Sequence, residues 1–333
     1  MLLNPLATLR RATILLALSV LSAACPLTLL AVALSGESAA AQAGFGSLDP
    51  APPTGITPDA IVQKFGQREA AFARARNEYT YRQTVKIDTI SNDTNKPDGE
   101  YLQVNDIVFS EDNTRSERVK FAPANTISRI IMNQNDFDDI AHRLPFVLTQ
   151  TDLPQYDLTY LGRQKVDDIA TFVFDCKPKT LEKGKRYFQG KVWVDQQEFQ
   201  IVLINGKSVP DDLRRGHEDL SPPYTTYYQE VDGGNWFPVY TKADATLHFP
   251  PDQGTLAQDV HIRYVVKYED YRRFRAKSRI IYNGQDLPPS APGAPAPQAA
   301  PDTPAAATPK QDPNALPPPD PDAPSLSRPK KPN

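Results

Sequence analysis

Side chains that alternate between apolar and polar over most of the chain constrain its fold more than any other feature. The stretch that begins at Tyr79 shows the pattern, because Tyr79, Tyr81, Val85 and Ile87 alternate with polar residues. A period of two puts one set of side chains on each face of a strand. Turn residues such as Asp232-Gly233-Gly234-Asn235 separate successive runs. The pattern predicts neighbouring antiparallel hairpins in a mainly β fold.

The other segments with this alternation, or with runs of β-branched and aromatic residues, are expected to be strands. They are Val104–Phe109, Arg115–Phe121, Tyr156–Leu161, Ile169–Cys176, the hairpin Val192–Leu203, Thr225–Val231, Trp236–Leu247 and Val260–Glu269. No internal repeat of about 20 to 50 residues is visible, which argues against a propeller or a solenoid.

Two helices are expected beside the strands. Thr57 and Pro58 supply an N-cap and a first-turn proline, and apolar residues at helical spacing extend this helix to about Asn77. A shorter helix is expected from Asn135 to Arg143, and Pro145 is expected to end it. This second helix is either a plain connector or a lid over one open face of the sheet.

The first 43 residues are typical of an export signal. Arg10-Arg11 precedes a charge-free apolar stretch from Ala12 to Ser35, and Ala41-Gln42-Ala43 offers a cleavage site. An uncleaved membrane anchor is the alternative, and lipidation at Cys25 is a weaker one. We therefore expect the protein in the periplasm, either free or anchored to the inner membrane.

Proline divides the rest of the chain into a folded part and a tail. Of the 33 prolines, 16 lie between Pro288 and Pro332, and the others occur at an ordinary frequency. Residues 286–333 are therefore expected to be a disordered Pro/Ala-rich tail. Residues 44–56 are expected to be a linker. Residues 57–285 are expected to be the folded domain, which is long enough to bury a core without disulfides.

Catalytic and cofactor motifs are absent from the sequence. It contains no G-x-S-x-G elbow, P-loop, H-E-x-x-H pair or C-x-x-C pair, and its four histidines are scattered. Cys176 is expected to be a core thiol and not a nucleophile. The net charge of −3 argues against nucleic acid as a partner. A solvated outer strand face or an envelope-facing contact explains the basic and aromatic segment from Tyr268 to Arg279 better than single-strand binding does. We expect no enzyme, no cofactor and no metal site.

Aromatic and β-branched side chains on one face of the expected elements form a candidate binding surface. They are an ordinary core in one interpretation. In the other, the strands form an incompletely closed antiparallel barrel whose concave face takes an acyl chain, with the helices as plug and lid. The candidate lining residues are Phe65, Phe72, Tyr79, Tyr81, Phe172, Phe174, Val192, Val194, Val239, Tyr264 and Val266, and the candidate lid residues are Phe137, Ile140 and Leu144.

Two short segments are similar to a known family. Gly190–Val202 (GKVWVDQQEFQIV) resembles the G-x-hydrophobic-W-hydrophobic-D hairpin of the LolA-like superfamily of outer-membrane lipoprotein-sorting proteins, and so does Trp236–Val239 (WFPV) after its Asp-Gly-Gly turn. The resemblance covers about Thr57 to Tyr282. It implies a half-open antiparallel barrel with helices in its concavity, and carriage of lipid or lipoprotein acyl chains across the periplasm.

The chain also departs from the family. It has a long connection around Asp136 to Leu153 and a proline-rich tail, and no position matches the ligand-handling residues of the family. The same fold also serves regulators that sense envelope stress. An envelope sensor or scaffold that binds another protein, with the tail as an extended docking segment, is therefore the alternative function.

Overall fold

The structure is a computed structural model. It describes residues 44–110, 114–146, 148–211, 221–232, 234–249 and 258–274, together with Leu316 and residues 320–328. The expected signal or anchor, residues 1–43, lies outside the described residues, and so does most of the tail expected from 286 to 333.

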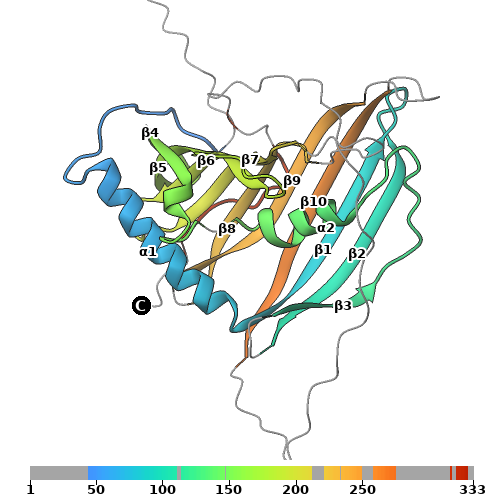
Figure 1. The fold of residues 1–333 in the computed structure, drawn as a ribbon, viewed down its shortest axis with the longest axis horizontal. Coiled ribbons are helices and arrows are strands. Elements are labelled where there is room, and N and C mark those ends of the chain that lie inside the picture. The colour runs from blue at the N-terminus through green and yellow to red at the C-terminus, as the bar shows by residue number, and fades with distance from the viewer. Residues whose placement is uncertain are drawn as a thin grey trace, which may run out of the picture. The chain divides into compact units, whose positions relative to one another are not determined.

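The described part of the chain is mainly β and forms one ten-stranded antiparallel sheet (Figure 1). The order across the sheet is β3-β2-β1-β10-β9-β8-β7-β6-β5-β4. Because β3 and β4 are its two edges, the sheet is open, which is consistent with the expected half-barrel. The strands are β1 Tyr79–Ile90, β2 Pro97–Phe109, β3 Arg115–Phe121, β4 Tyr156–Val166, β5 Ile169–Pro178, β6 Tyr187–Asp195, β7 Ile201–Val209, β8 Tyr224–Asp232, β9 Asn235–Phe249 and β10 Gln258–Arg273.

Each predicted strand segment lies in one of these strands, and the predicted hairpin Val192–Leu203 spans the turn between β6 and β7. Most neighbouring strands in the sheet form hairpins, as expected. The exception is the pair in which β1 lies beside β10, with Tyr79 opposite Arg273 and Ile90 opposite His261. This pairing joins the first and last strands of the domain. Alternation within a strand does not specify such a long-range neighbour.

The two predicted helices are present. The helix α1 spans Pro58–Arg76, and the Thr57 hydroxyl caps it by accepting a hydrogen bond from the Ala60 backbone N–H at 3.2 Å. The shorter helix is α2, Gln134–Asp138, which continues into the π-helical turn η1, Asp139–Arg143. A 3-10 turn, η2 at Leu153–Gln155, precedes β4. No helix among the described residues is long and apolar enough to cross a membrane.

Both α1 and the α2–η1 segment lie against one face of the sheet, which we call the inner face (Figure 1). Phe65 of α1 contacts Phe174 of β5 edge to face, with 5.9 Å between ring centroids. The opposite, outer face has its own core, in which Trp193 packs against Phe45 and donates a hydrogen bond from Nε1 to Gln164 Oε1 at 2.8 Å. The sheet therefore buries apolar side chains on both faces.

Residues 320–328, which we call the tail segment, lie against the outer face. Leu326 is fully buried, and its backbone N–H donates to the Asp167 carboxylate at 2.7 Å. Asp320 forms an ion pair with Lys242 at 2.7 Å, and Arg328 forms one with Asp195. These residues differ from the expectation of a tail without structure, because a buried leucine and two ion pairs offset the entropy lost when the segment is ordered.

Candidate ligand pocket on the inner face

The predicted lining residues lie on the inner face of the sheet or on the side of α1 that packs against it, and they are closely packed. Phe72 of α1 contacts Phe237 of β9 edge to face at 5.1 Å. Val239 is partly buried, whereas the others are at most 7% exposed; these are Phe65, Phe72, Tyr79, Tyr81, Phe172, Phe174, Val192, Val194, Tyr264 and Val266. Most of them therefore form core contacts, and two, Tyr81 and Tyr264, also border cavities.

The three predicted lid residues cover the middle of the inner face. Phe137 lies beside Tyr101 of β2, with 5.8 Å between ring centroids. Ile140 and Leu144 border a small cavity of about 30 Å³, whose opposite wall includes Tyr264. A cavity of this size has room for about one water molecule.

Hydrogen bonds from the inner face fix the chain that follows η1. The Thr226 hydroxyl donates to the Leu144 carbonyl at 2.9 Å, and the Tyr228 hydroxyl donates to the Phe146 carbonyl at 2.8 Å. Asp139 of η1 forms a buried ion pair with Arg186 at 3.4 Å. These contacts hold the segment against the inner face of the sheet.

A larger pocket of about 280 Å³ lies where the C-terminal end of α1 approaches η1 and the first strands of the domain. It is bordered by α1, β1, β2, β3, β9 and β10 as well as by η1. Its lining residues are Arg76, Asn77, Tyr81, Phe109, Arg115, Ala141, Pro145, Phe237, Pro238 and Tyr271. We call it the arginine–aromatic pocket.

Two guanidinium groups distinguish this pocket from the rest of the inner face. The Nε atoms of Arg76 and Arg115 are both buried and have no hydrogen-bond partner. Other atoms of the Arg115 guanidinium group do have partners. The group forms an ion pair with Glu117, and its Nη2 donates to Gln83 Oε1 at 3.2 Å. The pocket thus combines apolar walls with unused donors.

Aromatic rings form the apolar wall of the pocket. Tyr271 lies between Tyr81 and Phe237, with ring centroids 5.1 Å and 4.6 Å away. Its hydroxyl donates to the Pro238 carbonyl at 2.7 Å, which fixes the ring. Aromatic pairs at these distances stabilise one another beyond the burial of their area, so this wall is preformed.

A buried carboxyl group lies on the same helix as Arg76. Glu69 is 3% exposed, and burial raises its pKa to about 8, although a hydrogen bond from the Ile201 backbone N–H acts in the opposite direction. At neutral pH the group is therefore mainly protonated. It consequently adds little negative charge near Arg76.

Of the residues predicted to bind, only Tyr81 lines the arginine–aromatic pocket. Sequence reasoning missed the two arginines, although Arg76 lies in the last turn of the first predicted helix and Arg115 begins a predicted strand. Tyr271 belongs to the basic and aromatic segment that was assigned to a solvated strand face. No period or spacing links these positions, since they come from separate strands and one helix end.

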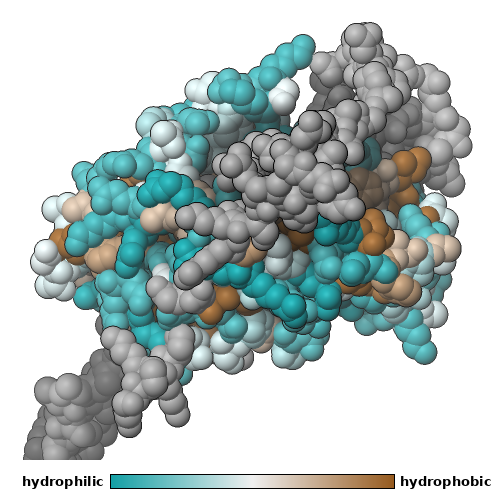
Figure 2. All heavy atoms as spheres, turned by 90° about the horizontal axis from the view of Figure 1, so that it is seen from below, coloured by the Kyte–Doolittle hydropathy of each residue, from teal (hydrophilic) through white to brown (hydrophobic). Residues whose placement is uncertain are grey.

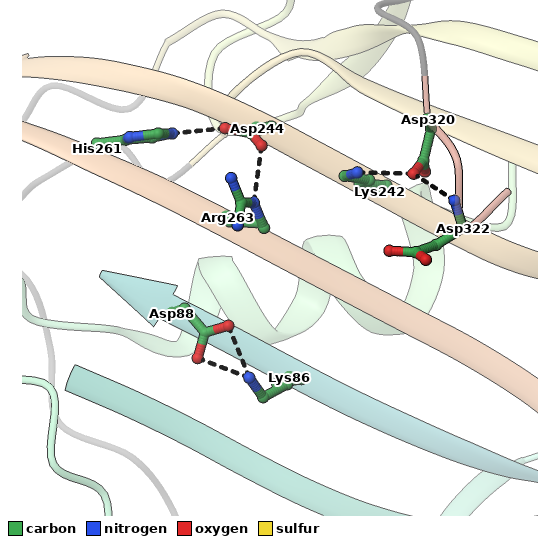
Figure 3. Close-up of polar contacts among 8 residues, drawn as sticks. All are labelled: Lys86, Asp88, Lys242, Asp244, His261, Arg263, Asp320 and Asp322. Atoms are coloured by element: carbon green, nitrogen blue, oxygen red, sulfur yellow. Dashed lines mark hydrogen bonds and ion pairs between the residues drawn. The ribbon is translucent and has the colours of Figure 1, made fainter. Parts of the chain in front are cut away.

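The outer face is polar around β1, β9 and β10 (Figure 3). Asp244 accepts hydrogen bonds from His261 at 2.5 Å and Arg263 at 2.7 Å, and Lys86 pairs with Asp88 at 2.7 Å. Among the described residues, no three His, Cys, Asp or Glu side chains gather as a metal site would require. Figure 2 views the molecule from below relative to Figure 1, and the coloured residues on that side are mainly hydrophilic, with apolar side chains in small groups.

The single cysteine among the described residues lies in the core. Cys176 is fully buried, and burial raises the pKa of its thiol. A buried, protonated thiol is a poor nucleophile. This placement agrees with the expectation of a core thiol.

Comparisons with known proteins found distant structural likenesses. No protein-family model matches the sequence, and no curated protein matches it. A DUF1329 family protein from Desulfovibrio piger matches with a TM-score of 0.30 and 11% identity, over 64% of this chain and 92% of that one. MucB in complex with MucA matches with a TM-score of 0.19 and 10% identity, over 65% and 100% of the two chains. The MucA/MucB complex of Pseudomonas aeruginosa matches with a TM-score of 0.19 and 8% identity, over 63% and 99%.

Likeness at this level does not establish the function of this chain.

Proposed function

We propose that this protein is a periplasmic binding or carrier protein for lipid or lipoprotein acyl chains, as the LolA-like resemblance of its hairpin suggested. The observation that carries the proposal is the arginine–aromatic pocket on the inner face of an open sheet. Concave sites with apolar walls and a few polar groups are the usual form of small-molecule sites. Each buried CH₂ group of an acyl chain stabilises the complex by about 0.8 kcal/mol.

A binding function also fits the absence of arranged catalytic groups in the described residues. The buried thiol of Cys176 and the protonated carboxyl of Glu69 lie within the core, with no second group arranged to work with either as nucleophile or base. Binding needs neither, because the chain only has to be removed from water and later released. We propose no enzymatic activity.

The test is mass spectrometry of ligands that accompany the protein when it is purified natively from a cell envelope extract. We expect a lipid or an acylated molecule, and we expect uptake of a fluorescent fatty acid by the emptied protein. Ala141→Leu, which places a larger side chain in the pocket, is expected to reduce that uptake. Ala71→Leu makes the same change at an exposed position of α1 and is the control. Absence of both co-purified lipid and fatty-acid uptake contradicts the proposal.

A second candidate is an envelope sensor or scaffold that binds another protein through the outer face. The tail segment favours it, because its contacts with Lys242 and Asp195 show that this face accommodates a peptide. Site-specific photo-cross-linking from position 242 in cells tests it, with the tail intact or removed. A protein adduct that forms only when the tail is absent supports a partner that competes with the tail. Equal labelling in both proteins contradicts this candidate.

A further inference from the structure

We propose that the ligand of the arginine–aromatic pocket is an anionic amphiphile, whose carboxylate or phosphate head binds Arg76 and Arg115 while its apolar chain lies against the aromatic wall. This inference rests on the proposed function and specifies its ligand class. It depends on the donors, the charges and the apolar surface that meet in one pocket.

A guanidinium group has five N–H donors in a planar fork that matches carboxylate and phosphate oxygens. Arg76 and Arg115 both line the pocket, and the Nε atom of each is buried without an acceptor. A buried donor that lacks a partner destabilises the protein until an acceptor reaches it. An anionic oxygen in the pocket would be such an acceptor for both groups.

The charges agree with an anionic head. The lining contains two guanidinium groups and no carboxylate. Glu117 pairs with Arg115 from outside the lining, and Glu78, near the end of α1, is engaged with Arg273 at 2.5 Å. The raised pKa of Glu69 leaves that carboxyl mainly neutral. The positive charge of Arg76 therefore has no carboxylate partner within ion-pair distance in the described residues.

The position of Arg76 in the last turn of α1 also has a simpler explanation. A cation there interacts favourably with the negative end of the helix dipole. That interaction accounts for a positive residue at this position. It does not account for a second arginine from β3, nor for the buried, unpaired Nε atoms that both share.

The aromatic wall determines the rest of the ligand. Phe109, Phe237, Tyr81 and Tyr271 border the same pocket as the arginines. Tyr81 and Phe237 are buried, but Phe109 and Tyr271 are only partly so, and a free inorganic anion would leave their exposed parts in contact with water. A wholly apolar ligand would bury the guanidinium groups without an acceptor, which is costly. A molecule with an anionic head and an apolar chain satisfies both parts of the pocket.

The experiment compares two fluorescent probes with the same chain, cis-parinaric acid, whose head is charged at neutral pH, and its methyl ester, whose head is neutral. We expect the acid to bind at least about tenfold more tightly than the ester, since a hydrogen bond to a charged group contributes that much. Arg76→Gln and Arg115→Gln are each expected to remove most of this preference for the acid over the ester. Arg118→Gln removes a charge from an exposed position of β3 and is the control.

Competition distinguishes the two head groups. Lysophosphatidic acid and a fatty acid of the same chain length are compared as displacers, with a monoacylglycerol as the neutral reference. The proposal is supported if either anion displaces the probe at a lower concentration than the neutral lipid does. The anion that displaces it at the lower concentration shows whether phosphate or carboxylate is preferred. Equal displacement by all three contradicts it.

The outcomes separate this inference from the proposed function. If acid and ester bind equally, the anionic head is wrong while lipid binding stands. If neither probe binds, both fail. The thermal transition of each arginine variant shows whether it folds. If one does not fold, the acid-to-ester affinity ratio of the unaltered protein still decides the question, because a charged head predicts a ratio that decreases with added salt.

Discussion

Glu69 of α1 accepts a hydrogen bond from the backbone N–H of Ile201 in β7, with 3.3 Å between Oε1 and N. This contact joins the helix to the middle of the sheet through a carboxyl group that is almost fully buried. Burial raises its pKa from 4.5 to about 8. The protonation of Glu69 is therefore linked to folding.

The first prediction is that the stability of the protein falls as Glu69 ionises. Below about pH 4.5 the group is protonated in both the folded and the unfolded chain. Between that pH and about 8 the folded chain keeps a proton that the unfolded chain has released, so stability decreases with rising pH. We expect the unaltered protein to lose a few kcal/mol relative to Glu69→Gln across this window, measured by urea unfolding. Glu182→Gln is the control, because Glu182 is exposed and its pKa is lowered. Parallel pH profiles for the unaltered protein and Glu69→Gln would show that the buried carboxyl does not titrate in this way.

The second prediction concerns the tail segment. Leu326 is fully buried on the outer face, so Leu326→Ala should lower the free energy of unfolding by about 2 to 5 kcal/mol. Leu181→Ala changes a leucine that is 51% exposed and should have little effect. Urea unfolding of the two variants gives the comparison. If both behave like the unaltered protein, the tail segment does not contribute to the folded state.

The third prediction concerns the cover of the inner face. Tyr228→Phe removes the hydroxyl that donates to the Phe146 carbonyl and leaves that buried acceptor without its partner. We expect a loss of about 1 to 3 kcal/mol. Hydrogen exchange should quicken around residues 144–146, while amides of β5 and β6 keep their protection. Uniform quickening across the sheet would show instead that the bond supports the whole fold.

The fourth prediction tests the hairpin that resembles the LolA-like family. A Cβ atom added at Gly190 would lie 2.2 Å from the Asn205 carbonyl oxygen on the neighbouring strand. Gly190→Ala should therefore separate β6 from β7 and lower the thermal transition markedly. Gly46→Ala is the control, because its nearest contact would be at 3.4 Å. An unchanged transition for Gly190→Ala would mean that the two strands are less close than described.

The sequence predicted the elements well because their signals are local. Alternation identified the strands, and the side chain of Thr57 fixed the start of α1. The site was less predictable, because Arg76 and Arg115 meet only after β1, β2 and β3 have paired. The docking of Leu326 was missed for a similar reason. A single leucine in a proline-rich segment gives no periodic signal, and its binding surface is formed by distant strands.

One turn of the sheet holds both ends of the described chain. The backbone N–H of Asp167, between β4 and β5, donates to the Gly44 carbonyl, and its carboxylate accepts from the Leu326 N–H. A pull applied between residues 44 and 328 would therefore act on contacts around this corner and on the outer-face ion pairs of the tail segment. None of these contacts involves a lining residue of the arginine–aromatic pocket. Tension on the two ends would therefore release the tail segment while that pocket keeps its shape.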